Sequence, residues 1–228
     1  IDLAVVGESA VFATYMANLN YIRNLWLSRS TDSGMTFDPP IQLNDGNWYE
    51  PACPTSAPRL QIGPDGHLNA VWLDRHEGVS HVYYARSTNG GQSIIQRTRL
   101  SQAGELVMGH PAIAITPDGA LHTVWEFFNE PLSAVNLNYS RSTDSGSSFS
   151  PPCAVSGGAI YFQWAPSAAA SPAGDLALGW HDERTGSPDV YVAMASGASA
   201  VGDAGIAPRA AYRAAPNPFR DWVGMSRL

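Results

Sequence analysis

The sequence has few basic residues, no basic cluster and no long apolar run. Its 13 lysine and arginine residues are outnumbered by 20 aspartate and glutamate residues, which gives a formal net charge of −7. Because binding to a phosphate backbone needs clustered positive charge, no nucleic-acid partner is predicted. A membrane-spanning helix needs about 18 consecutive apolar residues, so the sequence predicts no membrane span either.

Cysteine is scarce too, since Cys53 and Cys153 are the only two in the chain. They lie about two units apart in the repeat described below, and a disulfide requires Cα atoms within about 7 Å. We therefore expect two unpaired thiols. No C-x-x-C or H-x-x-x-H spacing is present, so the sequence predicts no metal site and no cofactor.

A helical apolar stripe is missing, and a repeat is present instead. The segment STDSGMTF at residues 30–37 returns as STDSGSSF at 142–149, with the variant STNGGQSI at 87–94. The first serines are 57 and 55 residues apart, and Trp72, Trp125 and Trp180 follow at intervals of 53 and 55 residues. A fixed period of about 50 residues indicates one supersecondary unit that has been copied.

One unit, taken from Pro111, reads PAIAI, TPDG, ALHTVW, a variable loop, VNLNYSR, STDSGSS and FSPPCAV. It contains four short segments rich in β-branched and aromatic residues, separated by turn sequences. Copies begin near residues 1, 57, 111 and 166. The sequence therefore predicts an all-β chain of about four antiparallel, four-stranded blades of a β-propeller over residues 1–200. Residues 201–228 are expected to hold a degenerate last strand or linker and the start of a C-terminal segment. A β-helix would need a shorter period, and a sandwich would not repeat.

The repeated octapeptide has a structural role in this interpretation. Its Asp accepts backbone hydrogen bonds, its Gly adopts positive φ, and the following aromatic packs the turn onto the blade. The middle copy carries Asn89 and Ile94 instead, so a looser turn is expected there. The residues assigned to these turns are Ser30, Asp32, Gly34, Phe37, Ser87, Asn89, Gly91, Ser142, Asp144, Gly146 and Phe149.

The pattern S-x-D-x-G-x-T-W/F resembles the Asp-box, or BNR repeat, of the sialidase-like propellers, and the resemblance covers most of residues 1–200. The segments WHDERTG at 180–186, DVY at 189–191 and WLDR at 72–75 are similar to bacterial members. The resemblance implies a six-bladed propeller, of which this chain would supply four blades, and a secreted or cell-surface location. The segment APNPF at 215–219 resembles the opening strand of a sorting or Ig-like domain, or it is a Pro-rich terminal turn.

In a propeller, the loops between strands two and three and those between successive blades gather on one face, here called the top face. The octapeptide turns lie on the opposite, bottom face. The repeat places aromatic, carboxylate and Arg side chains on the top face, where such groups bind sugars. The predicted substrate-binding residues are Trp48, Asp74, Arg75, His110, Glu126, Tyr161, Trp164 and His181, and the predicted catalytic residues are Tyr49, Glu50, Asp182 and Arg184. For the Asp and Arg pairs, the alternative is a structural role in which the Asp accepts hydrogen bonds from loop N–H groups and the Arg ties adjacent blades together.

The sialidase resemblance implies an Arg clamp, a Tyr nucleophile activated by a Glu, and an acid/base Asp. The clamp motif Arg-Ile-Pro is absent: its Arg position falls on Ser56, Gly109 and Trp164. Arg59 follows its Pro and is expected to point elsewhere, since strand side chains alternate. The loop at residues 17–21 carries no Asp.

Three functions remain open at this point. The first is an exo-α-sialidase type of glycoside hydrolase that acts on extracellular glycans. The second is a non-catalytic propeller that binds carbohydrate or protein at the cell surface. The third is a purely structural module. In each case an unclosed arc of blades is expected to expose apolar surface at its ends.

Overall fold

The computed structural model describes residues 1–19, 22–45, 48–49, 58–75, 79–155, 160–195 and 212–213. These residues form four antiparallel sheets in which the strands follow one another in sequence order, except that β5 of the first sheet pairs with β3. Blade 1 comprises β1 (Asp2–Val6), β2 (Ala10–Leu19), β3 (Ile22–Ser30), β4 (Ile41–Gln42) and the short β5 (Trp48–Tyr49). Blade 2 comprises β6 (Arg59–Ile62), β7 (Leu68–Asp74), β8 (His81–Ser87) and β9 (Gln96–Arg99).

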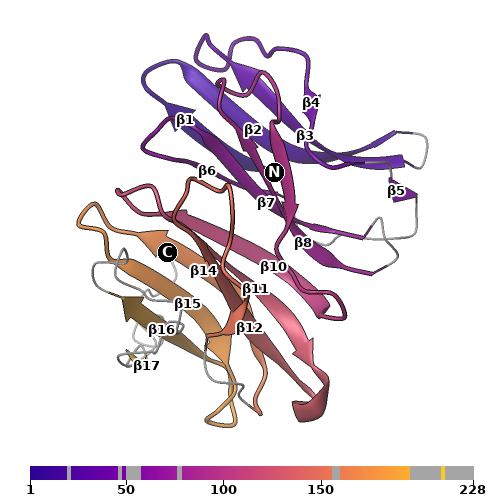
Figure 1. The fold of residues 1–228 in the computed structure, drawn as a ribbon, viewed down its shortest axis with the longest axis vertical. Coiled ribbons are helices and arrows are strands. Elements are labelled where there is room, and N and C mark those ends of the chain that lie inside the picture. Colours follow the sequence, from indigo (N-terminus) through magenta and orange to yellow (C-terminus); the bar gives the residue numbers. More distant parts are fainter. Residues whose placement is uncertain are drawn as a thin grey trace, which may run out of the picture.

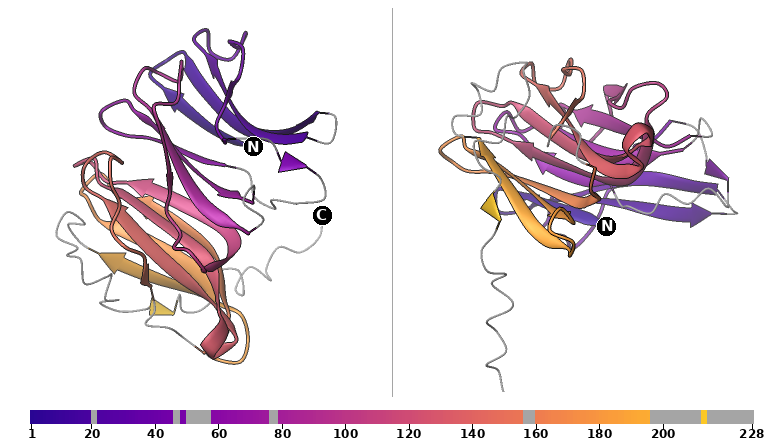
Figure 2. Two further views of the ribbon diagram at one scale, coloured as in Figure 1. Left: turned by 45° about the vertical axis from the view of Figure 1, so that its right-hand side comes forward. Right: turned by 90° about the horizontal axis from the view of Figure 1, so that it is seen from below.

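Blade 3 comprises β10 (Leu106–Ile115), β11 (Leu121–Asn129), the 3-10 helix η1 (Glu130–Leu132), β12 (Ala134–Ser142) and β13 (Cys153–Ala154). Blade 4 comprises β14 (Gln163–Ala170), β15 (Leu176–Asp182), β16 (Asp189–Ala195) and β17 (Tyr212–Arg213). The four sheets fan out in an open arc (Figures 1 and 2), in which β1 contacts β6, β6 contacts β10 and β10 contacts β14. The predicted all-β propeller architecture is confirmed.

The hydrophobic core lies between the blades. Because side chains alternate along a strand, each blade has two faces, and each of three clusters joins facing sides of two neighbouring blades. Trp72 packs with blade 1, Trp125 with blade 2 and Trp180 with blade 3, and all three are buried. The repeated tryptophan therefore marks the face of each blade that packs on the preceding blade.

The octapeptide turns form as the sequence predicts. The Ser30 hydroxyl donates to Asp32 at 2.7 Å and accepts from the Gly34 N–H at 2.9 Å. Asp32 accepts from the N–H and hydroxyl of Thr36 at 2.9 and 2.6 Å, and these hydrogen bonds lower the pKa of Asp32 to about 2. The third turn repeats all four contacts. The middle turn has four corresponding contacts, each slightly longer, but the Asn89 amide donates to the Ser93 hydroxyl where the Asp of the outer turns accepts, so the turn is closed but looser.

The third turn also fastens blade 3 to blade 2. Phe149 packs edge to face on Tyr84, with ring centroids 4.9 Å apart. Arg86 donates to the carbonyl of Ser145 within the turn, and Gln96 donates to the carbonyl of Gly146 at 2.9 Å. Phe37 has the same place in the first turn but is exposed. The predicted packing of the aromatic thus holds for the third turn and not for the first, because none of the blades in the described residues lies beside the first turn.

Both ends of the arc are apolar and exposed. Leu3 and Val5 of β1, and Val190 and Met194 of β16, are 42% to 66% exposed. Their neighbours Ala4 and Tyr191 point into the cores between blades, so the exposed residues face away from the arc. The expected exposure of apolar surface at the ends is confirmed.

Two further observations concern membrane-spanning helices and metal sites. No helix in the described part of the chain is long and apolar enough to cross a membrane. No group of three or more His, Cys, Asp or Glu residues in the same part is arranged to hold a metal ion. Cys153 lies partly buried in β13, while Cys53 lies outside the described residues.

A buried histidine lies in blade 3. The Nδ1 atom of His122 is 2.7 Å from the hydroxyl oxygen of Tyr139, and Nε2 is 3.3 Å from Oγ1 of Thr116. Burial lowers the pKa of His122 from 6.5 to about 4, so the ring is neutral at pH 7. In blade 2 the same register position is held by Asn69, which accepts a hydrogen bond from a tyrosine hydroxyl at 2.6 Å.

We predict that the turn glycines differ in sensitivity. Gly146 and Gly34 both have φ of 84°, so alanine is strained at either position. A Cβ at Gly146 would also overlap Tyr84, whereas Gly34 has open space. Gly34→Ala should lower the free energy of unfolding by about 1 kcal/mol and Gly146→Ala by at least about twice as much. Urea unfolding of both variants checks this, and equal losses would contradict the packing of the third turn on blade 2.

The buried histidine predicts a pH dependence of stability. Folding lowers the pKa of this histidine, so the folded state favours the neutral ring. The histidine therefore contributes fully to stability above its unfolded-state pKa, and this contribution is lost as the pH falls through the folded-state pKa. For His122 the window runs from 6.5 down to about 4. Between pH 8 and pH 5 the wild type should lose about 2 kcal/mol of unfolding free energy through this group. His122→Asn should lose correspondingly less over the same range; parallel losses would refute the assignment.

Candidate functional site

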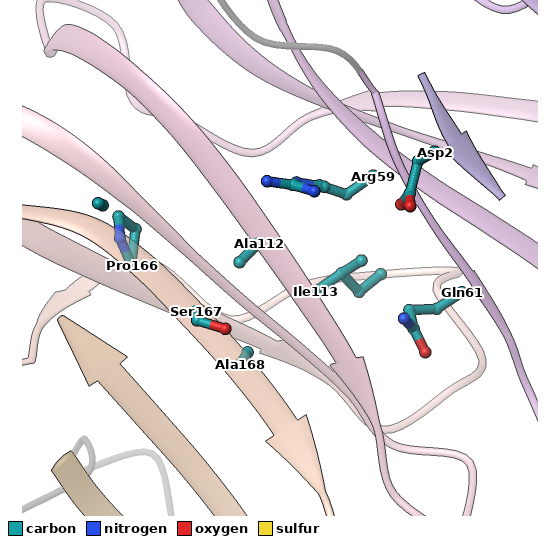
Figure 3. Close-up of a pocket in the computed structure, with 9 residues that line it drawn as sticks. Asp2, Arg59, Gln61, Ala112, Ile113, Pro166, Ser167 and Ala168 are labelled. Carbon is teal, nitrogen blue, oxygen red and sulfur yellow. The ribbon is translucent and has the colours of Figure 1, made fainter. Parts of the chain in front are cut away.

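A cavity of about 380 Å³ lies where the first strands of the four blades meet. It is open to solvent and is lined by residues of β1, β6, β10 and β14, as Figure 3 shows. Its polar side chains are Asp2, Arg59, Gln61 and Ser167, and Ala112, Ile113 and Pro166 contribute apolar surface. This axial cavity is the concave centre of the arc.

Four of the lining residues form one layer, because they hold the same register position in successive blades. Each pairs with the residue just before the repeated aromatic of the second strand: Asp2 with Thr14, Arg59 with Val71, Ala112 with Val124, and Ser167 with Gly179. Blade 1 thus contributes a carboxylate, blade 2 a guanidinium, blade 3 a methyl group and blade 4 a hydroxyl to a single level of the cavity.

The two charged groups of this layer have different tasks. One carboxylate oxygen of Asp2 accepts from the N–H of Leu3 at 3.1 Å, and the other accepts from the N–H of Leu60 at 2.9 Å. Asp2 therefore joins blade 1 to blade 2 through the backbone. Arg59 is exposed, and its guanidinium extends into the cavity on the side of Ala112 and Pro166 (Figure 3). The expectation that Arg59 points elsewhere is wrong, because the first strands themselves form the cavity wall.

The lip of the cavity on blade 4 is held in an unusual backbone conformation. Ala165 has φ of 51°, the left-handed region, at the irregular pairing between Trp164 and Ser167. Its N–H donates to Oε1 of Glu126 at 2.6 Å. Glu126 is buried, so this carboxylate from blade 3 fixes the lip of blade 4. The predicted substrate-binding residue Glu126 thus lies beside the cavity with a positioning role.

Trp164 and His181 come together on the same rim. Their rings are stacked, with centroids 5.5 Å apart and planes 13° from parallel. Both are partly buried, and Tyr161 nearby in sequence is 41% exposed. An aromatic rim of this kind suits the apolar face of a sugar ring. It differs from the smooth top face with buried aromatics that a purely structural module would have.

Asp182 and Arg184 are also adjacent, within a closed hydrogen-bond network. Asp182 is fully buried and accepts from Gln163 at 2.8 Å, from the Trp180 indole at 3.1 Å and from the Arg184 backbone and guanidinium. The Arg184 guanidinium also lies 4.2 Å from the centre of the Tyr191 ring. Burial alone would raise the pKa of Asp182, but these hydrogen bonds outweigh it and lower the pKa. An ionised carboxylate with this many donors favours the structural alternative over a role as a proton donor.

Asp74 repeats this arrangement in blade 2. It is buried and accepts from the Trp72 indole at 3.2 Å, while the neighbouring Arg75 is exposed. Trp48 and Tyr49 form β5, which pairs with Arg23 and Ile22 at the top end of β3. They remain on the top rim, in a strand and not in a loop.

The other predicted positions stay predictions. His110 lies within β10 where the pairing with β11 is irregular, and Glu50 lies outside the described residues. Sequence reasoning did not select Asp2, Gln61, Ser167, Gln163 or Glu105. The layer formed by Asp2, Arg59, Ala112 and Ser167 was available from the alignment of the repeats, because these residues share one register position.

Comparison with protein-family models and with curated proteins finds no match for this sequence. Solved structures do match. The GH93 α-L-arabinofuranosidase of Fusarium graminearum, solved with arabinobiose, aligns with a TM-score of 0.61 and 14% identity over 86% of this chain and 61% of that chain. A PL25 ulvan lyase bound to -[GlcA(1-4)Rha3S]- aligns with a TM-score of 0.57 and 10% identity over 86% of this chain and 51% of that chain.

The NanB sialidase of Streptococcus pneumoniae, as its K499G mutant, aligns with a TM-score of 0.53 and 14% identity over 76% of this chain and 26% of that chain. The chain therefore spans less than two thirds of each of these three proteins. At such identities the likeness shows the fold alone. That fold is the Asp-box β-propeller of the sialidase and arabinanase type, as the sequence resemblance implied.

We predict that Asp182 stabilises the fold. Asp182→Asn replaces an acceptor by an amide that cannot accept from all the same donors, and it removes the buried counter-charge of Arg184. The free energy of unfolding should fall by about 2 to 4 kcal/mol in urea titrations. The neighbouring Glu183→Gln, with the same change of charge, should stay within about 0.5 kcal/mol of the wild type. A folded Asp182→Asn protein of unchanged stability would argue against the structural role.

Proposed function

We propose that this chain provides the glycan-binding face of a carbohydrate-active propeller protein, with the axial cavity as its saccharide site. The observation that carries the proposal is the layer at the centre of the arc, where the Arg59 guanidinium, the Ser167 hydroxyl and the Gln61 amide line one open cavity. Ligand sites in proteins are concave, mostly apolar and carry a few converging polar groups. The stacked rings of Trp164 and His181 extend the site with a flat surface at the rim.

The charges of the cavity favour a saccharide that carries a carboxylate. Arg binds carboxylates with two parallel hydrogen bonds, and the Asp2 carboxylate beside it is already occupied by two backbone N–H groups. Since the protein as a whole is acidic, the guanidinium is the group that would offset the repulsion of an anionic ligand. A sialidase and a lyase bound to a glucuronate-containing glycan share the fold, which supports the proposal by likeness only.

Hydrolysis of the exo-α-sialidase type is the more specific form of this proposal, with Tyr49 and Glu50 as nucleophile and its activating base. Extracellular glycans as substrates, and a secreted or cell-surface location, go with it. The non-catalytic alternative is favoured by two observations. The chain has no Arg-Ile-Pro motif, and Asp182 and Arg184 are tied to each other within blade 4. Further blades would supply the remaining groups that hydrolysis needs.

The binding proposal predicts a charge-dependent affinity. Titration calorimetry with sialyllactose and with a glucuronate disaccharide should detect binding that Arg59→Ala weakens at least about tenfold, or about 1.4 kcal/mol, because the carboxylate loses its partner. Arg29→Ala is the matched control. It removes the same charge from the bottom end of β3, where Arg29 lies 3.8 Å from Asp38, and it should leave the affinity unchanged.

Equal affinities for the wild type and Arg59→Ala would refute the axial site. The same preparations distinguish the two forms of the proposal when they are incubated with a fluorogenic α-linked sialoside. Release of the fluorophore that Glu50→Gln abolishes would establish hydrolysis and place a catalytic group on this chain. Arg59-dependent binding without release would support the non-catalytic propeller.

A further inference from the structure

A second cavity, of about 320 Å³, lies at the top of blade 3. It is formed by the connection between β9 and β10 and by the connection between β11 and β12, which contains η1. Its principal side chains are Glu105, Phe127, Phe128, Asn129, Glu130 and Asn138. None of its lining residues lines the axial cavity, so the two are separate sites.

Blade 3 departs here from the pattern of its neighbours. In blades 2 and 4 the buried tryptophan indole donates to an Asp two residues later in the same strand, at 3.2 and 3.1 Å. In blade 3 that position holds Phe127. The Trp125 indole donates instead to Oε1 of Glu105, at 2.7 Å. Glu105 comes from the loop that enters the blade, so the acceptor has moved from the strand to the loop.

Because a loop Glu replaces the strand Asp, the buried indole keeps its hydrogen-bond acceptor, while the residues at the surface differ from those of the other blades. The Glu105 carboxylate also accepts from the Asn138 amide at 2.8 Å and from the Gln102 N–H at 2.9 Å, which fixes its orientation. Phe127 holds the position of the Asp in blades 2 and 4, and Phe128 follows it. Both phenylalanines are only partly buried and line the cavity. Glu105 already provides the acceptor that the Trp125 indole needs. The fold therefore does not require an aromatic residue at position 127.

The polar groups of this cavity are chiefly acceptors. Glu105 and Glu130 contribute carboxylates, the amide nitrogens of Asn129 and Asn138 already donate to Asn136 and Glu105, and no Lys or Arg is among the lining residues. Hydroxyl groups are donors that match such a wall, and phenylalanine rings pack against the apolar face of a pyranose or furanose. Two carboxylates would repel a carboxylated or sulfated sugar.

We propose that the cavity at the top of blade 3 is a second saccharide site, which takes an uncharged sugar ring. It is independent of the axial cavity and differs from it in charge: Arg59 selects for an anionic group, and Glu105 and Glu130 select against one. A glycan that contains both acidic and neutral residues would contact both sites.

Saturation-transfer NMR and titration calorimetry with arabinobiose, cellobiose and N,N′-diacetylchitobiose test this proposal. At least one of these uncharged disaccharides should bind. Phe128→Ala should weaken binding at least about tenfold through loss of ring contact, and Glu130→Gln should weaken it less. Glu8→Gln, with the same change of charge on the exposed bottom face, should leave binding unchanged, as should Arg59→Ala.

The expected result is therefore binding of an uncharged sugar that depends on Phe128 and is indifferent to Arg59. Failure of all three disaccharides to bind, or binding that Phe128→Ala and Glu130→Gln leave intact, would overturn the proposal. Binding that Arg59→Ala abolishes would place the sugar in the axial cavity and would likewise overturn it. Thermal unfolding of each variant verifies that it is folded, and Glu130→Gln keeps the test decisive should Phe128→Ala destabilise blade 3, because Glu130 is exposed.

Discussion

The packing of each blade on the blade before it is the constraint on which the rest of this structure depends. A single four-stranded sheet has two faces and cannot bury both alone, so every blade presents its tryptophan face to its predecessor. The octapeptide turn strengthens the same contact in blade 3, where Gly146 lies against Tyr84 and Phe149 covers the same ring. At the two ends of the described arc, on β1 and β16, apolar residues that face away from the arc are exposed. The placement of the four first strands, and with it the axial cavity, follows from this repeated contact.

The buried tryptophan also creates a polar requirement, because its indole N–H needs an acceptor in a region without water. Blades 2 and 4 meet the requirement with Asp74 and Asp182. The sequence motif around Asp182 and Arg184 therefore has a physical reason that is independent of catalysis. Blade 3 meets the same requirement with Glu105, from a different element. The buried indole thus has an acceptor from a strand in two blades and from a loop in the third. For this reason, acidic residues of similar chemistry have different roles in different blades.

The scaffold thus contains two cavities that differ in their charged side chains. The axial cavity contains Arg59. The nearby Asp2 carboxylate accepts hydrogen bonds from backbone N–H groups and not from the Arg59 guanidinium. The blade 3 cavity is lined by the fixed Glu105 carboxylate, which accepts from the Asn138 amide, and by Phe127 and Phe128. The blade 3 cavity lies on the connections between strands, where a rigid β scaffold tolerates variation without loss of its core. If both proposals hold, the two cavities together would bind a glycan that contains acidic and neutral residues.

The sequence by itself determined the repeat, the four-stranded unit, the turns at Asp32, Asn89 and Asp144 and the position of the tryptophans, because these depend on local turn chemistry and on a period that is visible in one dimension. Tertiary structure alone decided which polar residues face a cavity. Arg59 was misplaced because strand alternation assigns a side chain to one face of its own sheet, and it does not say that the first strands of four blades enclose a common space. The acceptor role of Glu105 was equally hidden, since the contact joins residues 20 positions apart on different elements. The local sequence pattern therefore predicts the blade, and the packing of one blade on the next determines which residues line the cavities.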